Sequence, residues 1–385
     1  MSVLKRKLYL SLIEHPKLIQ KQIFKALKWK DGNVYEDHQN THMYILPAGI
    51  FQEIRIELRN TIGKKLARNL LYSLNQLSAD AIIKDAIEQD FKGKELFKYF
   101  CAIMSLFGWG YAEHLDFDSS TGNGTITISR FPQSNIPQQE PVHDDFAGIL
   151  ARAFELSYGG KYEVKETKCS EMAGGGQECT YQIIPLKEGT QVMGSKVDVL
   201  QIEKLDAKSI VNPEEFDKLI DQLSMPENGV LMLGEKSAAR RLVIKDVASI
   251  NSMFLKTADL LGWKTMGPVL FRVGRSHLLK DLPSTERMDI AAIKAYLRKL
   301  TLFGWGIFDV AQKGESTYHV VLTRNPFTAG MPLQQVATDY LIGGFISGMF
   351  ESLAGKRVTV KETECAVKGD KHCLFEVSVL AGRKE

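Results

Sequence analysis

An internal duplication limits the folds that are open to this chain. The string Phe-Gly-Trp-Gly begins at Phe107 and recurs at Phe303, 196 residues later, and Cys169 and Cys365 are separated by the same number of residues. A repeat of this length predicts two related folding units in one chain. The chain has 385 residues, which is enough for each unit to bury a core of its own.

Each copy of the repeat contains a glutamate and two cysteines, placed between two segments that alternate like β-strands. These residues are Glu166, Cys169 and Cys179 in the first copy, and Glu362, Cys365 and Cys373 in the second. The pattern predicts a β-hairpin whose connection presents a carboxylate and two thiols. Because side chains two apart share a sheet face, each glutamate should lie in line with apolar residues on the inward face. A buried carboxylate is costly unless it is paired or bound to a metal, and zinc accepts both thiolate and carboxylate ligands.

A fourth ligand is expected on the helix before each hairpin. Residues 333–353 carry apolar side chains at helical spacing, and Asp339 lies on the same stripe as Val336 and Ile346. The matching residue of the first half is His143. The sequence therefore predicts two zinc sites, formed by His143, Glu166, Cys169 and Cys179 and by Asp339, Glu362, Cys365 and Cys373. The alternative is that the cysteines are small core residues near a turn and that each glutamate pairs with a lysine.

Composition places the chain among ordinary globular proteins, with 44% hydrophobic and 25% charged residues. The net charge of +3 gives no sign of a nucleic-acid-binding surface. Four of the five cysteines belong to the repeated motif and Cys101 lies in an apolar run, so we expect no disulfide framework and a reducing, cytoplasmic environment. The apolar run at residues 8–13 is too short for a transmembrane helix, and we expect neither a membrane span nor a signal peptide.

The order of predicted elements indicates an α+β fold made of two tandem repeats. Each half reads as a short hairpin, three helices, the Phe-Gly-Trp-Gly string leading into a strand, a ligand-bearing helix and the cysteine hairpin. The three helices are expected at 49–62, 66–77 and 91–105 in the first half and at 248–261, 269–280 and 288–300 in the second. Each half should form a mostly antiparallel sheet with helices packed on one side, and the two halves should form an internal pseudo-dimer. The expected domains are 1–186 with an N-terminal helix, a partly helical linker at 187–228, and 229–385.

These motifs resemble the 4-vinyl reductase domain family, which is often described as hydrocarbon-binding. The resemblance rests on Gly-Trp-Gly before a strand, a ligand-bearing helix with Gly344 and Gly348, and Glu-x2-Cys-x7-Cys in a hairpin. It covers residues 31–186 and 229–380. Related domains sense phenolic effectors in bacterial transcription activators, and the fold is shared with vesicle-tethering TRAPP subunits and haem-based nitric-oxide sensors.

The resemblance also implies roles for particular residues. In the phenol-sensing members the zinc ligands look like Cys, Glu, Cys and Cys. The last three match Glu362, Cys365 and Cys373 at the same spacing, and Glu166, Cys169 and Cys179 with two residues inserted. The chain departs from the family at the first ligand, where His143 and Asp339 stand. The family implies a zinc ion that braces a closed pocket, because four protein ligands leave no position for a reacting water. Its ligand cavity lies beside the Gly-Trp-Gly element, so the candidate ligand-binding residues are Phe107, Trp109, Phe303 and Trp305. The alternative is that these four are ordinary core aromatics.

Three functions remain open on this reading. The favoured one is a protein that binds or senses a hydrophobic or aromatic small molecule and has one or two structural zinc ions per chain. The second is a scaffold or assembly protein, by analogy with the tethering subunits, and the third is a tetrapyrrole vinyl reductase or its accessory factor. No phosphate-binding or dinucleotide-binding string is present, so a binding protein is favoured over an enzyme. A downstream signalling or assembly protein would then receive any signal.

Overall fold

Three antiparallel sheets organise the part of the chain that the computed structural model describes, which is residues 20, 24–36, 41–88, 90–132, 141–170, 178–187, 211–234, 240–281 and 289–380. The central sheet has six strands in the order β1-β2-β3-β10-β9-β8. Their bounds are Leu27–Lys30, Asn33–Glu36, Thr41–Pro47, Arg240–Asp246, Val230–Leu233 and Leu223–Glu227. Each half of the chain therefore supplies three neighbouring strands to one shared sheet.

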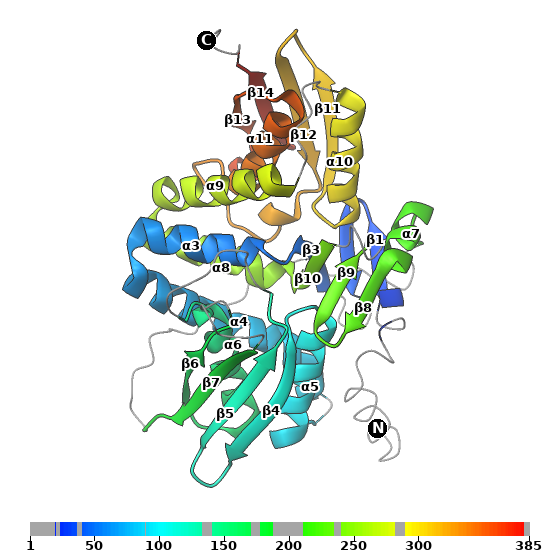
Figure 1. Cartoon of the computed structure of the whole chain (residues 1–385). Coiled ribbons are helices and arrows are strands. Elements are labelled where there is room, and N and C mark those ends of the chain that lie inside the picture. Colours follow the sequence, from blue (N-terminus) through cyan, green and yellow to red (C-terminus); the bar gives the residue numbers. More distant parts are fainter. Residues whose placement is uncertain are drawn as a thin grey trace.

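The other two sheets have four strands each and belong to one half apiece. The first runs in the order β4-β5-β7-β6 and the second in the order β11-β12-β14-β13. The bounds in the first are Tyr111–Asp118, Asn123–Ser129, Glu178–Pro185 and Tyr162–Lys168. Those in the second are Ile307–Gln312, Thr317–Thr323, Cys373–Val379 and Val358–Glu364. The two sheets lie at opposite ends of the molecule (Figure 1).

The helices repeat in the same order. The first half contains α3 (Ile50–Ile62), α4 (Lys64–Glu88), α5 (Gly93–Leu106) and α6 (Asp144–Tyr158). The second contains α8 (Val247–Leu261), α9 (Trp263–Asp281), α10 (Ile290–Leu302) and α11 (Tyr340–Ala354). Helices α3, α4, α8 and α9 lie between the two four-stranded sheets, and α3 contacts α9 while α4 contacts α8 (Figure 1). The predicted α+β fold of two related units is confirmed.

The halves are joined by hydrogen bonds that cross between them around the centre of the shared sheet. Ile45 of β3 lies opposite Ile244 of β10. The indole nitrogen of Trp109 donates to the carbonyl oxygen of Ile244 at 3.0 Å, and that of Trp305 donates to the carbonyl oxygen of Ile45 at 3.0 Å. Each Phe-Gly-Trp-Gly element thus attaches to the strand contributed by the other half.

Four predicted helices need correction. The helix expected at 66–77 continues to Glu88, and the one expected at 269–280 begins at Trp263. The helix expected from residue 333 begins at Tyr340, and Leu333 is 78% exposed, because the chain before Asp339 runs over the surface. The amide of Gln334 donates to the carbonyl of Val367 and not to a helical turn. The N-terminal helix, expected over residues 1–30 from the sequence, is wrong at its end, because Leu27–Lys30 form strand β1; most of its length lies outside the described residues. The predicted linker contains helix α7 (Glu214–Gln222) and also strand β8.

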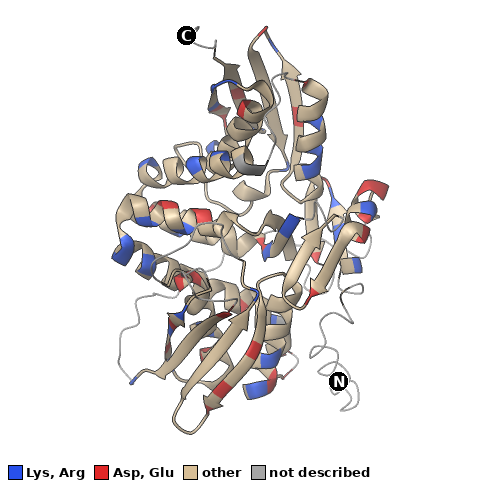
Figure 2. Ribbon diagram, viewed as in Figure 1, with Lys and Arg blue, Asp and Glu red and all other residues tan. Residues whose placement is uncertain are grey.

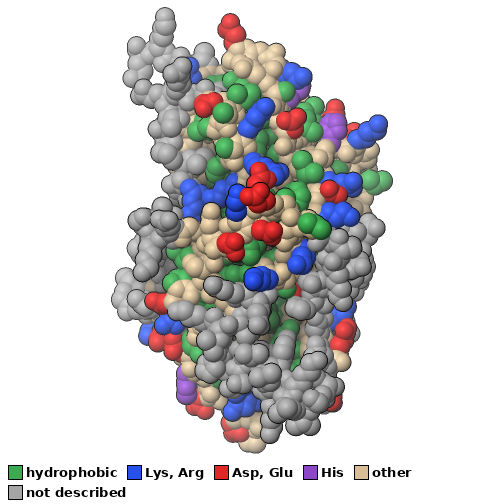
Figure 3. Space-filling view, turned by 90° about the vertical axis from the view of Figure 1, so that its right-hand side faces the viewer, with side chains coloured by type: hydrophobic (Ala, Val, Ile, Leu, Met, Phe, Trp, Pro, Cys, Tyr) green, Lys and Arg blue, Asp and Glu red, His purple; other side chains and the backbone are tan. Residues whose placement is uncertain are grey.

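Charged residues of both signs are mixed on the described parts of the molecule that Figure 2 and Figure 3 show. Figure 2 shows Lys and Arg interspersed with Asp and Glu on helices and strands of both halves. On the face in Figure 3, acidic and basic side chains lie next to one another and among apolar ones. This agrees with the near-balanced net charge of the sequence. Within the described helices, no segment has the length and hydropathy needed to cross a bilayer.

Candidate metal centres and ligand cavity

The structure brings the first predicted group of ligands together. One donor atom each from His143, Glu166, Cys169 and Cys179 lies within 4.8 Å of every other, and all four side chains are buried. The Nδ1 atom of His143 lies 3.6 Å from the Sγ atom of each cysteine. A tetrahedral zinc with bonds of about 2.3 Å to sulfur and about 2.0 Å to nitrogen separates such atoms by about 3.5 Å. The spacing of these three donors therefore fits a zinc ion.

Local structure fixes the direction of the ligands at the first site. His143 immediately precedes α6, and the ring of Phe131 packs against its imidazole at 4.3 Å between centroids. Glu166 Oε2 accepts hydrogen bonds from the amides of Val142 and His143, at 2.9 and 2.8 Å, which leaves Oε1 directed at His143 Nδ1, 2.7 Å away. The amide of Ser170 lies 3.4 Å from the Sγ atom of Cys179. A ligand set held by backbone amides in this way is preorganised for an ion.

The second group has the same construction. One donor atom each from Asp339, Glu362, Cys365 and Cys373 lies within 4.8 Å of the others. Asp339 immediately precedes α11, and its amide donates to Glu362 Oε2 at 3.2 Å. The amide of Ala366 lies 3.4 Å from Cys373 Sγ, as that of Ser170 does from Cys179. In both hairpins the strand pairing shifts register directly after the glutamate and shortly before the first cysteine.

Asn325 is a difference between the two sites. It follows Arg324, as Phe131 follows Arg130, and both arginines adopt a positive φ. The Asn325 amide nitrogen donates to Asp339 Oδ2 at 2.7 Å and lies 3.4 Å from Cys373 Sγ. The Asn325 amide thus donates a hydrogen bond to the carboxylate of Asp339, whereas the Phe131 ring packs against the imidazole of His143.

The second site is a buried cluster of acidic groups. Burial, followed by the charge of Asp339, raises the pKa of Glu362 to about 11. Burial and the Cys365 thiolate raise the pKa of Asp339 to about 6. Asp339 Oδ1 and Glu362 Oε1 are buried and have no hydrogen-bond partner among the described residues. Two orphaned carboxylate oxygens beside two thiols are the donors that a divalent cation would satisfy.

His143 is the basic group of the first site. Burial alone would lower the pKa of His143, but the carboxylate of Glu166 and the two thiols outweigh it and raise that pKa well above its usual value. The pKa of Glu166 is lowered, because the attraction of His143 exceeds the effect of burial. A zinc ion bound at Nδ1 of His143 would take the place of a proton there.

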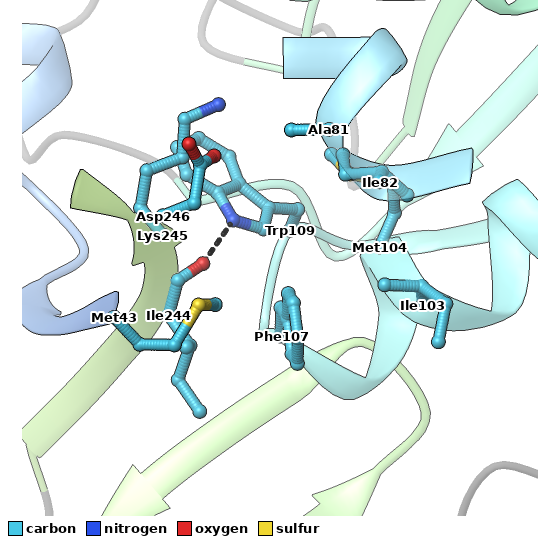
Figure 4. A pocket seen from close by; sticks show the side chains of 10 residues that line it. All are labelled: Met43, Ala81, Ile82, Ile103, Met104, Phe107, Trp109, Ile244, Lys245 and Asp246. Carbon is cyan, nitrogen blue, oxygen red and sulfur yellow. Dashed lines mark hydrogen bonds between the residues drawn. The ribbon is translucent and has the colours of Figure 1, made fainter. Parts of the chain in front are cut away.

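Phe107 and Trp109 lie at a small cavity between the two halves. Its lining comprises Met43, Ala81, Ile82, Ile103, Met104, Phe107, Trp109, Ile244, Lys245 and Asp246. Figure 4 shows Trp109 and Phe107 facing the apolar side chains of α4 and α5. The cavity volume is about 20 Å³, which corresponds to roughly one water molecule.

The corresponding aromatics of the second half are packed by other rings. Trp305 is fully buried, and the rings of Phe345 and Phe327 lie 4.7 and 5.5 Å from it. Phe303 is buried as well, with the ammonium of Lys299 5.6 Å from its ring centroid. The predicted roles of all four aromatics in ligand binding stay predictions, and the cavity described here lies at the first pair.

Sequence reasoning missed Lys245, a lysine that lines the cavity. The pairing of Ile45 with Ile244 makes Leu46 the counterpart of Lys245, but the repeat itself carries no sign that Lys245 is buried. A lysine in a strand is usually exposed, and the repeat alone does not say which face is covered by the other half.

A family model matches part of the second half of the chain. Residues 319–379 match the model of the 4-vinyl reductase domain family, a stretch that contains Asp339, Glu362, Cys365 and Cys373. The predicted resemblance to this family is confirmed there. No curated protein matches the chain.

Three solved structures are similar to parts of the chain. The phenol-responsive sensory domain of the transcription activator PoxR, with phenol, is 18% identical; the match covers 43% of this chain and 88% of that one, with a TM-score of 0.35. A vinyl-4-reductase family protein from Methanocaldococcus jannaschii is 20% identical over 29% of this chain and 68% of that one, with a TM-score of 0.25. Subunit 3 of a trafficking protein particle complex from Naegleria fowleri, covalently bound to palmitic acid, is 17% identical over 35% and 96%, with a TM-score of 0.29.

Proposed function

We propose that this chain, whose residues 319–379 match the 4-vinyl reductase domain, binds an apolar small molecule and is braced by two structural zinc ions. The zinc ligands are His143, Glu166, Cys169 and Cys179 in the first half and Asp339, Glu362, Cys365 and Cys373 in the second. The ligand site is the cavity at Phe107 and Trp109. The observation that carries the proposal is the convergence of two four-residue donor groups, each within 4.8 Å, at equivalent places of a duplicated fold.

Zinc suits both sites, because each offers two thiols and two further donors in a buried place. Bound by four protein ligands, the ion would brace the structure and leave no position for a reacting water. Each site joins the start of a helix to a β-hairpin: α6 to β6 and β7, and α11 to β13 and β14. The metal would thus fix the angle between a helix and the sheet beneath it.

The first site is connected to the cavity through α4. Helix α6 packs so closely on α4 that a side-chain carbon on Gly148 would lie 2.0 Å from the carbonyl oxygen of Tyr72. The hydroxyl of Tyr72 accepts a hydrogen bond from the amide of Val164, on β6, at 3.1 Å. Further along the same helix, Ala81 and Ile82 line the cavity. Anything that holds α6 and β6 in place therefore also holds one wall of the ligand site.

Metal content tests the first part of the proposal. Protein purified without added metal should contain two zinc atoms per chain by elemental mass spectrometry. Cys179→Ser and Cys373→Ser should each retain one zinc, while Cys101→Ser is the matched control, because Cys101 lies half-buried on α5 outside both groups, and should retain two. Wild-type protein without zinc would contradict the proposal.

Filling the cavity tests the second part. Ala81→Met places a longer side chain into the cavity lining and should weaken the binding of an apolar probe such as 1-naphthol by about tenfold or more. Lys84→Met introduces the same side chain on the exposed face of α4 and should leave binding unchanged. Equal affinities for both variants, measured by calorimetry, would place the ligand elsewhere.

A further inference from the structure

Lys245 is a buried cation without an ion-pair partner among the described residues. It belongs to β10 of the second half, yet it lines the cavity of the first half and is only 5% exposed. Its ammonium donates to the hydroxyl of Ser78 on α4 and lies 5.4 Å from the ring centroid of Trp109. In the part of the chain that the structure describes, no carboxylate lies within 4 Å of Nζ. A buried charge of this kind is costly unless a counter-charge is supplied.

The two nearest acidic groups are engaged elsewhere. Asp246 caps α8, where its carboxylate accepts a hydrogen bond from the amide of Ser249 at 2.7 Å. Asp145 forms a buried ion pair with Arg55, at 2.9 Å. Both acids attract the Lys245 ammonium from a distance, but burial dominates and lowers its pKa. The described part of the protein therefore leaves the amine without a direct counter-ion.

The duplication shows that the fold does not require a lysine at this position. Leu46 is its counterpart in β3, and it occupies the same place in the shared sheet on the other side of the Ile45–Ile244 pair. There the neighbouring Trp305 is covered by the ring of Phe345 instead of an ammonium. The equivalent position of the other half holds leucine, so the fold itself does not need a lysine here. The presence of a lysine beside an apolar cavity is best explained by a ligand that it binds.

We propose that the Lys245 ammonium and the Ser78 hydroxyl bind the carboxylate of an apolar acid, whose hydrocarbon part lies against Trp109 and Phe107. The inference rests on the proposed function and names the chemical class of its ligand. Both groups can donate hydrogen bonds to one carboxylate, and a charge-assisted pair in a dry site is strong. The cavity of about 20 Å³ must widen to admit such a molecule. Met43 and Met104 line it, and unbranched thioether side chains change shape easily.

A matched pair of probes separates charge from shape. Binding of 1-naphthoate and of 1-naphthamide to the full, metal-loaded chain is measured by calorimetry. The acid is expected to bind about tenfold tighter than the amide, because only the acid completes an ion pair. Lys245→Met should abolish that preference, and Ser78→Ala should reduce it. Lys299→Met is the control, since Lys299 stands over Phe303 in the other half, and it should preserve the preference.

The outcomes distinguish this inference from the proposed function. If acid and amide bind the wild type equally and Ala81→Met weakens both, the cavity binds ligands but Lys245 does not select them, and the inference is wrong. If the acid keeps its preference in folded Lys245→Met protein, as judged by circular dichroism, another group recognises the carboxylate and the inference is again wrong. If no apolar probe binds at all, the proposed function fails together with the inference.

Discussion

Lys245 is the residue at which function and stability are expected to conflict. Replacing it by methionine keeps the length of the side chain and removes a buried cation. We expect Lys245→Met to stabilise the protein by about 1 kcal/mol at pH 7. The measurement is the midpoint of urea unfolding at an unchanged m-value. Lys264→Met, an exchange on the exposed face of α9, serves as the control and should change stability by less than about 0.5 kcal/mol.

The pH dependence of that gain follows from the lowered pKa of Lys245. The unfolded chain titrates near the usual value of 10.5, and the folded protein releases the proton at a lower pH because of burial. Below the lowered pKa the amine is charged in both states, so the penalty for burying it is complete. As the pH rises from there to 10.5 the penalty disappears, and the advantage of methionine should shrink with it. A gain that grows as the pH approaches 10.5 would contradict this account.

Single residues of the candidate sites were predictable to different degrees. Alternation along the hairpins placed Glu166 and Glu362 on the inward face, and the repeat selected His143 and Asp339 from all other polar residues. These are local properties of a strand and of an alignment between copies. Lys245 was not predictable in this way, since its burial is caused by α4 of the other half, and no local pattern carries that information.

At the level of elements, apolar spacing alone misjudged where α11 begins. The spacing continues back to Leu333, but Leu333 and Val336 are exposed, at 78% and 43%. The helix can begin only at Tyr340, because the chain before it returns across the surface to bond with Val367. The prediction of an apolar stripe held from Leu341 onward, where the side chains face the core. A periodic pattern thus located the helix without fixing its first turn.

The Gly-Trp-Gly elements depend on glycine for their approach to the other half. Gly108 has a φ of +84°, and a side-chain carbon on it would lie 2.5 Å from the carbonyl oxygen of Leu242, on β10. Gly108→Ala should therefore destabilise the protein by about 2–4 kcal/mol, through strain and overlap together. Gly63→Ala is the matched control, because Gly63 has a φ of +82° and open space around it. It should cost less than Gly108→Ala, about 1–2 kcal/mol, because it adds backbone strain without overlap. Equal losses in urea unfolding would mean that the contact with β10 is not tight.

Removing the proposed metal should loosen specific elements and spare others. A chelator is expected to increase amide hydrogen exchange in β6, β7, β13 and β14 and in the first turns of α6 and α11, because those segments meet at the two sites. The shared sheet, whose strands β3 and β10 are buried between the halves, should keep its protection. Exchange that rises evenly over the chain would instead indicate global unfolding, and no change would contradict a structural metal.

For the whole molecule, the sequence predicted two related halves but not how they join. The strands at 41–47 and 240–246 were expected within separate units, whereas they pair with each other at the centre of one sheet. The two halves have similar patterns of alternating apolar residues, so these strands could pair within each half or between the halves. The periodicity of the sequence does not distinguish the two arrangements. The boundaries at 186 and 229 stay predictions, and strand β8 lies inside the expected linker.

This joint sheet makes each half dependent on the other. Expressed separately, residues 1–187 and 211–385 should each expose one edge of the broken sheet and the apolar faces beneath Trp109 and Trp305. We expect each fragment to aggregate or self-associate, and co-expression to yield a one-to-one complex that size exclusion and native mass spectrometry can detect. The physical reason is that β3 pairs with β10 and that both indole nitrogens donate across the halves. Two stable, folded monomeric fragments that do not associate when mixed would show that the halves fold independently.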